Sequence, residues 1–178
     1  RTAISSVNFK ETLQKLADQL VGIVGSDECF INLWDDELQM VLPGAANGET
    51  DATYQMIPAM QGEASMTRAV LHSGEPLFVP DVLNSEFTSN RVSEHFSTKA
   101  ALALPMIIGD QKLGSVIFGF FELLQLTRRE ISLCKQFADQ VGLAISKSWA
   151  LELAHQRAQE ADNLRQATAA ISSSLDLN

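Results

Sequence analysis

The sequence has few cysteines and no metal-ligating residues grouped around them. Its two cysteines, Cys29 and Cys134, each lie within an apolar pattern, without another Cys or a His at ligand spacing. Neither a disulfide framework nor a zinc site is therefore predicted. We expect no bound metal, and a reducing compartment, the cytoplasm, as the location of the protein.

Basic residues are also scarce. The 178 residues include 13 Lys and Arg against 22 Asp and Glu, which gives a formal net charge of -9. This sign is wrong for a surface that follows nucleic-acid phosphates, so no nucleic-acid partner is expected. No apolar run approaches the roughly 20 residues that span a bilayer, and no signal-peptide pattern opens the sequence. The sequence therefore predicts no membrane insertion and one full domain with its own core.

The two ends of the sequence predict a piece of a longer protein. The sequence begins at Arg1 without an initiator methionine and ends inside a helical pattern. Residues 2–9 also resemble residues 169–177. Either this short similarity is a coincidence, or a second copy of the same unit begins after residue 168 and continues past Asn178.

Hydrophobic periodicity predicts a helix at each end of the chain and strands between them. The first part is expected to form a helix over about residues 7–24, strands over 29–35 and 38–42, a loop over 44–51 and an edge strand over 54–58. The second part is expected to form a helix over 62–72, a strand over 77–80, a polar segment over 81–98, and strands over 100–108 and 112–121 around a turn at Gly109 and Asp110. The last strand is rich in β-branched and aromatic residues, so it should be central.

A long final helix follows. Thr127 and Glu130 match a capping box at its start, and the helix would run for ~70 Å to about Leu175 at 1.5 Å per residue. Residues spaced by three and four predict two successive seams with a shift of phase between them. The first seam, which should pack on the sheet, is Ile131, Cys134, Ala138, Val141 and Ile145. The second, which predicts a modest coiled coil and a homodimer, is Ala150, Ala154, Arg157, Ala161, Leu164, Thr168, Ile171 and Leu175.

Three blocks of the sequence carry a family resemblance. They are Leu-His-Ser-Gly-Glu-Pro-Leu-Phe-Val-Pro-Asp-Val at 71–82, Ala-Ala-Leu-Ala-Leu-Pro-Met at 100–106 with Lys-Leu-Gly-Ser-Val-Ile at 112–117, and Leu-Thr-Arg-Arg-Glu-Ile at 126–131 with Phe-Ala-Asp-Gln-Val-Gly-Leu-Ala-Ile at 137–145. In this order they resemble the GAF domain family of small-molecule sensors. The resemblance implies an α/β (α+β) fold, with a central antiparallel sheet flanked by helices and a long C-terminal signalling helix. We expect a GAF-like sensory domain over residues 1–150, and over residues 151–178 a linker or coiled-coil helix that leads to a further domain.

The resemblance implies a non-catalytic, cytoplasmic sensory module that binds an unidentified small molecule. It dimerises through its N- and C-terminal helices and passes the signal to an output domain, most commonly a histidine kinase, otherwise a cyclic-dinucleotide enzyme or a transcription regulator. No P-loop, G-x-S-x-G motif or strand-end carboxylate pair indicates an enzyme.

Specialised members of the family need particular residues for their ligands, and the sequence can be searched for these residues. Members that carry a covalent bilin need a Cys in the polar segment or the helix after it, and residues 81–98 have none, so no bilin is expected. The methionine sulfoxide reductase variant needs several cysteines around its pocket. Cys29 lies in the first strand pattern and Cys134 in the last helix, so this activity is not expected. Cyclic-nucleotide binders carry an Asn-Lys-Phe-Asp-Glu set, which Asn90, Phe96 and Lys99 echo without the acidic pair. Binding of a cyclic nucleotide stays an alternative, as does a dimerisation scaffold without a ligand.

The candidate site lies between a strand face and the polar segment 81–98, since long segments of this kind are often binding loops. Strand alternation puts a polar residue between two aromatic ones on the face opposite Cys29, and small residues of a later strand leave space beside it. Core packing explains the same phenylalanines, and a helix N-cap explains Asp81. The candidate ligand-binding residues are Phe30, Asn32, Trp34, Asp81, Phe87, Asn90, Phe96, Ala101 and Ala103.

Overall fold

The computed structural model describes residues 7–175, with side chains over residues 9–172. Of the two similar stretches, 2–9 and 169–177, residues 2–6 and 176–177 lie outside the described residues, as does the side chain of Leu175. The elements in chain order are α1 (Val7–Val24), β1 (Glu28–Asp35), β2 (Met40–Ala46), α2 (Thr50–Met56), α3 (Met66–Ser73), β3 (Leu77–Val79), α4 (Asn90–Ser93), β4 (Ala100–Ile108), β5 (Gln111–Phe120) and α5 (Arg128–Leu175).

The five strands form one antiparallel sheet in the order β2-β1-β5-β4-β3. The predicted α+β class with a central antiparallel sheet is therefore confirmed. β5 lies in the middle, as its apolar composition predicts, and is buried from Leu113 to Phe120. Gly109 and Asp110 make the turn between β4 and β5, and this hairpin leads directly toward α5.

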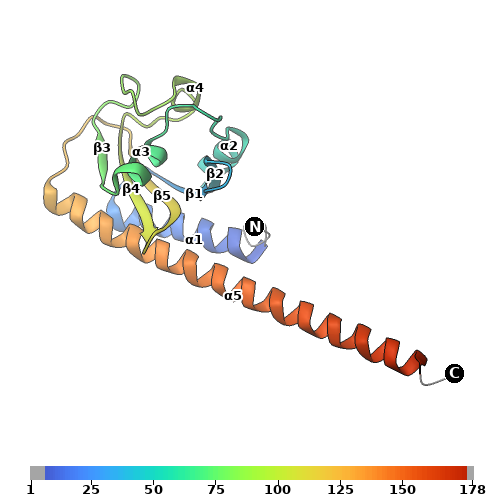
Figure 1. The fold of residues 1–178 in the computed structure, drawn as a ribbon. Helices are drawn as coiled ribbons and strands as arrows, with labels where there is room; N and C mark the ends of the chain where they lie inside the picture. Colours follow the sequence, from blue (N-terminus) through green and yellow to red (C-terminus); the bar gives the residue numbers. More distant parts are fainter. Residues whose placement is uncertain (1–6, 176–178) are drawn as a thin grey trace.

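Helices cover both faces of the sheet (Figure 1). α1 and α5 contact each other and lie on one face, and α2 and α3 lie on the other. Since strand side chains alternate, Cys29, Ile31 and Leu33 of β1 belong to the core beneath α1 and α5. Phe30 belongs to the core on the opposite face. β1 therefore separates a packed helical core from the face on which a ligand site was predicted.

Two predicted elements between β1 and α3 are wrong. Residues 54–58 do not form an edge strand, because Tyr54 belongs to helix α2, whose end precedes Pro58. The predicted loop over 44–51 begins too early, because β2 continues to Ala46. A Cβ atom on Gly44 would lie 2.5 Å from the carbonyl oxygen of Ile31. Small residues in this stretch therefore allow the close pairing of β2 with β1.

α3 begins four residues later than predicted and ends one residue later, at Ser73. Ser65 precedes it, and its Oγ accepts a hydrogen bond from the Arg68 N–H at 3.4 Å. Gly74 ends the helix in the left-handed region at φ 75°, with its N–H bonded to the Val70 carbonyl. The polar segment 81–98 contains one helical turn, α4.

α5 is a continuous helix of 48 residues. The predicted capping box is confirmed: the Glu130 N–H donates to Thr127 Oγ1 at 3.3 Å, and the Thr127 N–H donates to Glu130 Oε2 at 2.7 Å. The first seam packs on the sheet, where its residues from Cys134 to Ile145 are buried. No described helix is long and apolar enough to cross a membrane.

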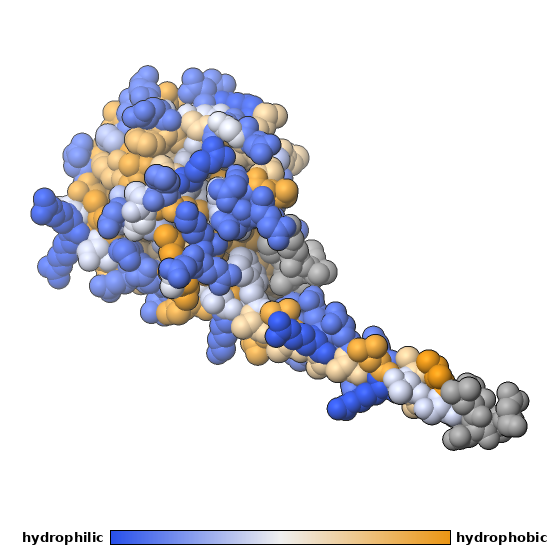
Figure 2. Space-filling view, viewed as in Figure 1, coloured by the Kyte–Doolittle hydropathy of each residue, from blue (hydrophilic) through white to orange (hydrophobic). Residues whose placement is uncertain are grey.

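The second half of α5 projects away from the sheet (Figure 1). Its described seam residues from Ala150 to Ile171 are all exposed. Figure 2 shows apolar side chains along this projecting part, where Leu164 is 69% exposed and Ile171 is 62% exposed. The described part of the chain offers no sheet to cover them.

Candidate functional site

An open cavity lies on the sheet face opposite α1 and α5. Its volume is about 120 Å³, which is close to the roughly 150 Å³ of an apolar protein cavity that binds benzene. The cavity is therefore large enough for a small organic molecule. Its lining residues are Phe30, Asn32, Val41, Pro43, Tyr54, Ile57, Pro58, Ala59, Ala64, Ser65, Met66, Thr67, Val82, Phe87, Thr88, Ser89, Val92, Ser93, Phe96, Thr98, Ala101 and Ile117.

Five of the nine predicted site residues line this cavity. β1 supplies Phe30 and Asn32, β4 supplies Ala101, and the segment 81–98 supplies Phe87 and Phe96. The rings of Phe30 and Phe96 meet edge to face, with centroids 5.0 Å apart. Strand alternation accounts for the two β1 residues, and the long polar segment accounts for the two phenylalanines.

The other four predicted residues do not line the cavity. Trp34 packs with Val41 and Leu71 in a separate cluster toward the end of β1, and its indole N–H donates to Asp36. Ala103 lies on the same face of β4 as Ala101 and is buried in the same core, but it does not line the cavity. The remaining two are polar residues outside the cavity: Asp81 accepts a hydrogen bond from the Asn84 side chain, and Asn90 is exposed at the start of α4.

A chain of buried polar side chains, which we call the polar corner, borders the cavity; Asn32, Tyr54 and Thr67 line it, and Ser115 does not. The Tyr54 hydroxyl donates to Asn32 Oδ1 at 2.7 Å, and Asn32 Nδ2 donates to Ser115 Oγ at 3.4 Å. The hydroxyls of Ser115 and Thr67 are hydrogen-bonded at 2.8 Å. This network joins α2, β1, β5 and α3, so it fixes both short helices against the central strands. Burial raises the pKa of Tyr54, which keeps the phenol protonated as a donor.

Sequence reasoning missed Tyr54, Thr67 and Ser115. Two of them carried a signal in their patterns. Thr67 is a polar residue within the apolar stripe of α3, three positions before Val70, and Ser115 interrupts an apolar strand. Ser115 also lies directly opposite Asn32 in the pairing of β1 with β5, which puts both side chains on one face.

The lining carries no charged side chain among the residues that the structure describes. Nearby cations are already engaged: Arg91 is paired with Glu63, and Arg68 donates to the Glu63 carbonyl at 3.1 Å. Lys99, which echoed a cyclic-nucleotide motif, is exposed and is not part of the lining. The cavity therefore presents apolar groups and neutral hydrogen-bonding groups.

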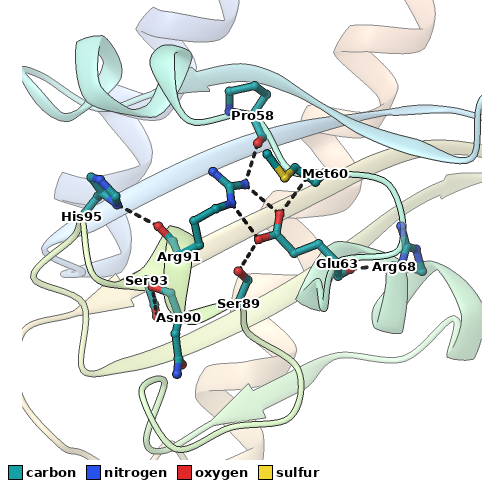
Figure 3. Close-up of polar contacts among 9 residues, drawn as sticks. All are labelled: Pro58, Met60, Glu63, Arg68, Ser89, Asn90, Arg91, Ser93 and His95. Atoms are coloured by element: carbon teal, nitrogen blue, oxygen red, sulfur yellow. Dashed lines mark hydrogen bonds and ion pairs between the residues drawn. The ribbon is translucent and has the colours of Figure 1, made fainter.

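An ion pair joins two segments that both line the cavity, and we call it the Glu63–Arg91 clasp. Glu63 lies between α2 and α3, and Arg91 lies in α4; Figure 3 shows the two side chains pointing toward each other. Arg91 Nε donates to Glu63 Oε1 at 2.9 Å, and Nη2 donates to Oε2 at 2.8 Å. Nη2 also donates to the Pro58 carbonyl, and the Ser89 hydroxyl and the Met60 N–H donate to the carboxylate. Hydrogen bonds from Arg91 hold the pKa of Glu63 down to about 2.

A buried carboxyl, that of Glu28, lies next to the cavity without lining it. The hydroxyl of Thr98, a lining residue, donates to Glu28 at the start of β1. Burial raises the pKa of Glu28, the Thr98 hydroxyl opposes this, and the nearby Asp27 charge raises it further. This pair fixes the end of the segment 81–98 to β1.

Both cysteines are unpaired and buried. Cys29 and Cys134 lie in the core beneath α1 and α5, on the other side of the sheet from the cavity. Within the described part of the chain, no three His, Cys, Asp or Glu side chains are gathered as a metal site would require.

The sequence matches the GAF domain family over residues 8–145. The chain belongs to the GAF domain family. GAF domains are regulatory, non-catalytic modules that occur in signalling proteins. Among curated proteins, no relative matches this sequence.

Solved GAF domains share this fold. The GAF domain of a phosphoenolpyruvate-protein phosphotransferase from Coxiella burnetii has a TM-score of 0.71 and 18% identity, over 85% of this chain and 90% of that one. A domain of a protein described as a two-component sensor histidine kinase from Sinorhizobium meliloti 1021 has a TM-score of 0.63 and 21% identity, over 85% and 99%. A GAF domain/HD domain protein from Geobacter sulfurreducens has a TM-score of 0.67 and 14% identity, over 84% and 97%. At these identities the likeness concerns the fold.

Proposed function

We propose that this GAF domain is a cytoplasmic sensor that binds a small molecule in the cavity and passes the change through α5 to an output domain. The observation that carries the proposal is the cavity itself, which is open between the sheet, the short helices and the segment 81–98. A scaffold without a ligand has no need of such a space. The two unpaired cysteines suit a reducing compartment.

The covalent path from cavity to helix is short. The segment 81–98 leads into β4, β4 turns into β5, and β5 leads to Thr127 at the start of α5. A ligand that contacts Phe87 and Phe96 holds this segment in one arrangement. It shifts α5 only by binding two arrangements with different affinity, and a coupling of ~1 to 3 kcal/mol is typical.

The projecting part of α5 supports the second half of the proposal. Pairing with the same seam of a second copy would bury its exposed apolar side chains and so stabilise the helix. The pair would carry a rotation or a register change to the next domain, over residues 151–178. The likeness to a domain of a sensor histidine kinase protein favours a histidine kinase as that output.

Cyclic-nucleotide binding is the less favoured alternative, because nothing charged in the described lining faces a phosphate. A thermal-shift screen of cAMP, cGMP and small metabolites on the chain tests both. Phe87→Ala should reduce the shift produced by a binding compound. Phe121→Ala is the matched control, because Phe87 is 36% exposed and Phe121 is 39% exposed, and only Phe87 lines the cavity. A shift that survives Phe87→Ala unchanged would place the site elsewhere.

A further inference from the structure

Four aromatic rings line the cavity: Phe30, Tyr54, Phe87 and Phe96. Phe30 contacts Tyr54 and Phe96, with ring centroids 5.4 Å and 5.0 Å apart, and Phe87 lines the same space from the segment 81–98. Such rings can bind a flat apolar molecule through edge-to-face and stacking contacts. The available volume of about 120 Å³ is close to the roughly 150 Å³ of an apolar cavity that binds benzene, which suits a single ring.

A charged ligand would bind weakly in this cavity. Burying a charge without a partner is costly, and the described lining offers neither a cation nor a carboxylate. The guanidinium of Arg91, close by, is occupied by Glu63 and by the Pro58 carbonyl. An anion would have to break the Glu63–Arg91 clasp to obtain a counter-charge.

The polar corner has hydrogen-bonding capacity to spare. Asn32 Nδ2 carries two hydrogens and donates one bond, to Ser115, among the residues that the structure describes. Asn32 Oδ1 is occupied by the Tyr54 hydroxyl, which holds the amide in place. A second N–H of Asn32, a cavity-lining residue, thus remains for an acceptor atom of a ligand.

We propose that the cavity takes an uncharged, mainly apolar ligand of about one ring, with a carbonyl or hydroxyl oxygen that accepts the second N–H of Asn32. This inference rests on the proposed sensory function and narrows it to a ligand class. It separates this site from one built for a phosphorylated or carboxylated metabolite.

Three molecules of nearly the same shape test the charge: benzamide, benzoate and benzamidine are neutral, anionic and cationic near pH 7. Their binding to the whole chain is measured by NMR titration up to about 10 mM. Benzamide should bind at least about tenfold more tightly than the two ions. Tighter or equal binding of either ion at the cavity overturns the ligand class and leaves the sensory function intact. If none of the three binds, the ligand class is overturned, while the sensory function is decided separately by the thermal-shift screen.

A second pair tests the hydrogen bond. Acetophenone and α-methylstyrene share one shape, and only acetophenone carries an acceptor. Acetophenone should shift the side-chain amide signals of Asn32 and bind several-fold more tightly, and Asn32→Leu should remove that preference. The amide signals of the unmutated chain decide the matter if the variant does not fold. Equal binding of the two compounds without a shift at Asn32 overturns the assigned contact.

Discussion

Arg91 holds both carboxylate oxygens of Glu63 in parallel, at 2.9 and 2.8 Å, across 28 positions of sequence. Bidentate pairs of this kind fix geometry as well as supplying energy. Here they fix one cavity-lining segment to another, so the pair controls how firmly the segment 81–98 is held.

Glu63→Gln should therefore destabilise the protein in a pH-dependent way. A carboxyl whose pKa is lowered by folding adds stability above its unfolded pKa and loses it as the pH falls toward about 2. The deficit should be about 1 kcal/mol at pH 7, because Arg91 is 38% exposed and the pair is screened, and it should vanish near pH 2. Urea unfolding at pH 7, 5 and 3 measures this loss of unfolding free energy.

Asp139→Asn, at an exposed pair with Lys135, is the control and should have less effect on the unfolding free energy. A deficit that does not change with pH contradicts this account of Glu63.

Tyr54→Phe should cost about 1 kcal/mol of unfolding free energy, the usual value for one buried hydrogen bond. The loss should be smaller when Asn32 is already replaced by Leu, because Tyr54 then lacks its 2.7 Å acceptor. Thermal or urea unfolding of the two single variants and the double variant gives this coupling. Simple additivity of the two losses would show that the hydrogen bond between Tyr54 and Asn32 contributes no stability.

Gly114→Ala should be among the most damaging single changes in the sheet. Gly114 has φ 148°, and a Cβ atom there would lie 1.9 Å from the Asn32 carbonyl oxygen. Backbone strain and overpacking together suggest a loss on the order of 3 kcal/mol. Gly22→Ala in α1 is the matched control, since its Cβ would meet nothing within 4 Å and helix propensity predicts a gain of up to about 1 kcal/mol. Similar effects of the two changes on the melting temperature would refute the argument.

Neither thiol should react quickly in the native protein. Burial raises the pKa of both Cys29 and Cys134, and a protonated, covered thiol is a poor nucleophile. Labelling with a maleimide at pH 7 should follow unfolding and not precede it. Replacing both by Ala should lose stability through the cavities left behind, on the order of 1 kcal/mol each, without altering ligand binding. Rapid labelling of the folded chain would disprove this.

The exposed seam of α5 should make the chain a homodimer, which light scattering at tens of micromolar can measure. Leu164→Asp together with Ile171→Asp should yield monomers, because the change puts charge at two large, exposed apolar residues of the seam. Gln159→Asp with Gln166→Asp adds the same charge on the opposite side of the helix and should leave the dimer intact. A monomeric mass for the unmutated chain would rule the dimer out.

The sequence predicted most elements because their apolar periodicity is long or regular, as in α1, β4, β5 and α5. α2 escaped because Tyr54-Gln55-Met56-Ile57 alternates like a strand before Pro58. Its helical state depends on contacts across the chain: the Tyr54 hydroxyl reaches Asn32, and Asp51 accepts the Ala46 N–H at 2.8 Å. A single-sequence pattern does not contain such contacts.

The same reason limits what could be predicted of the cavity. Alternation along one strand places Phe30 and Asn32 together, and it places Trp34 with them although Trp34 packs with Leu71 beyond the cavity. The polar partners of Asn32 are distant in the sequence: Tyr54 is 22 residues away and Ser115 is 83 residues away. Thr67 lies 48 residues from Ser115. Distances of this kind follow from the fold and not from local spacing.

The strict alternation of β1 has a consequence for insertions and deletions. One residue added or removed within Cys29–Asn32 would exchange the two sets of side chains, sending Ile31 toward the cavity and Asn32 into the core beneath α1 and α5. The segment 81–98 pairs with no strand over most of its length and can change length without such an exchange. Homologous GAF domains should thus differ in ligand preference through the length and content of this segment, while the number of residues in β1 stays constant.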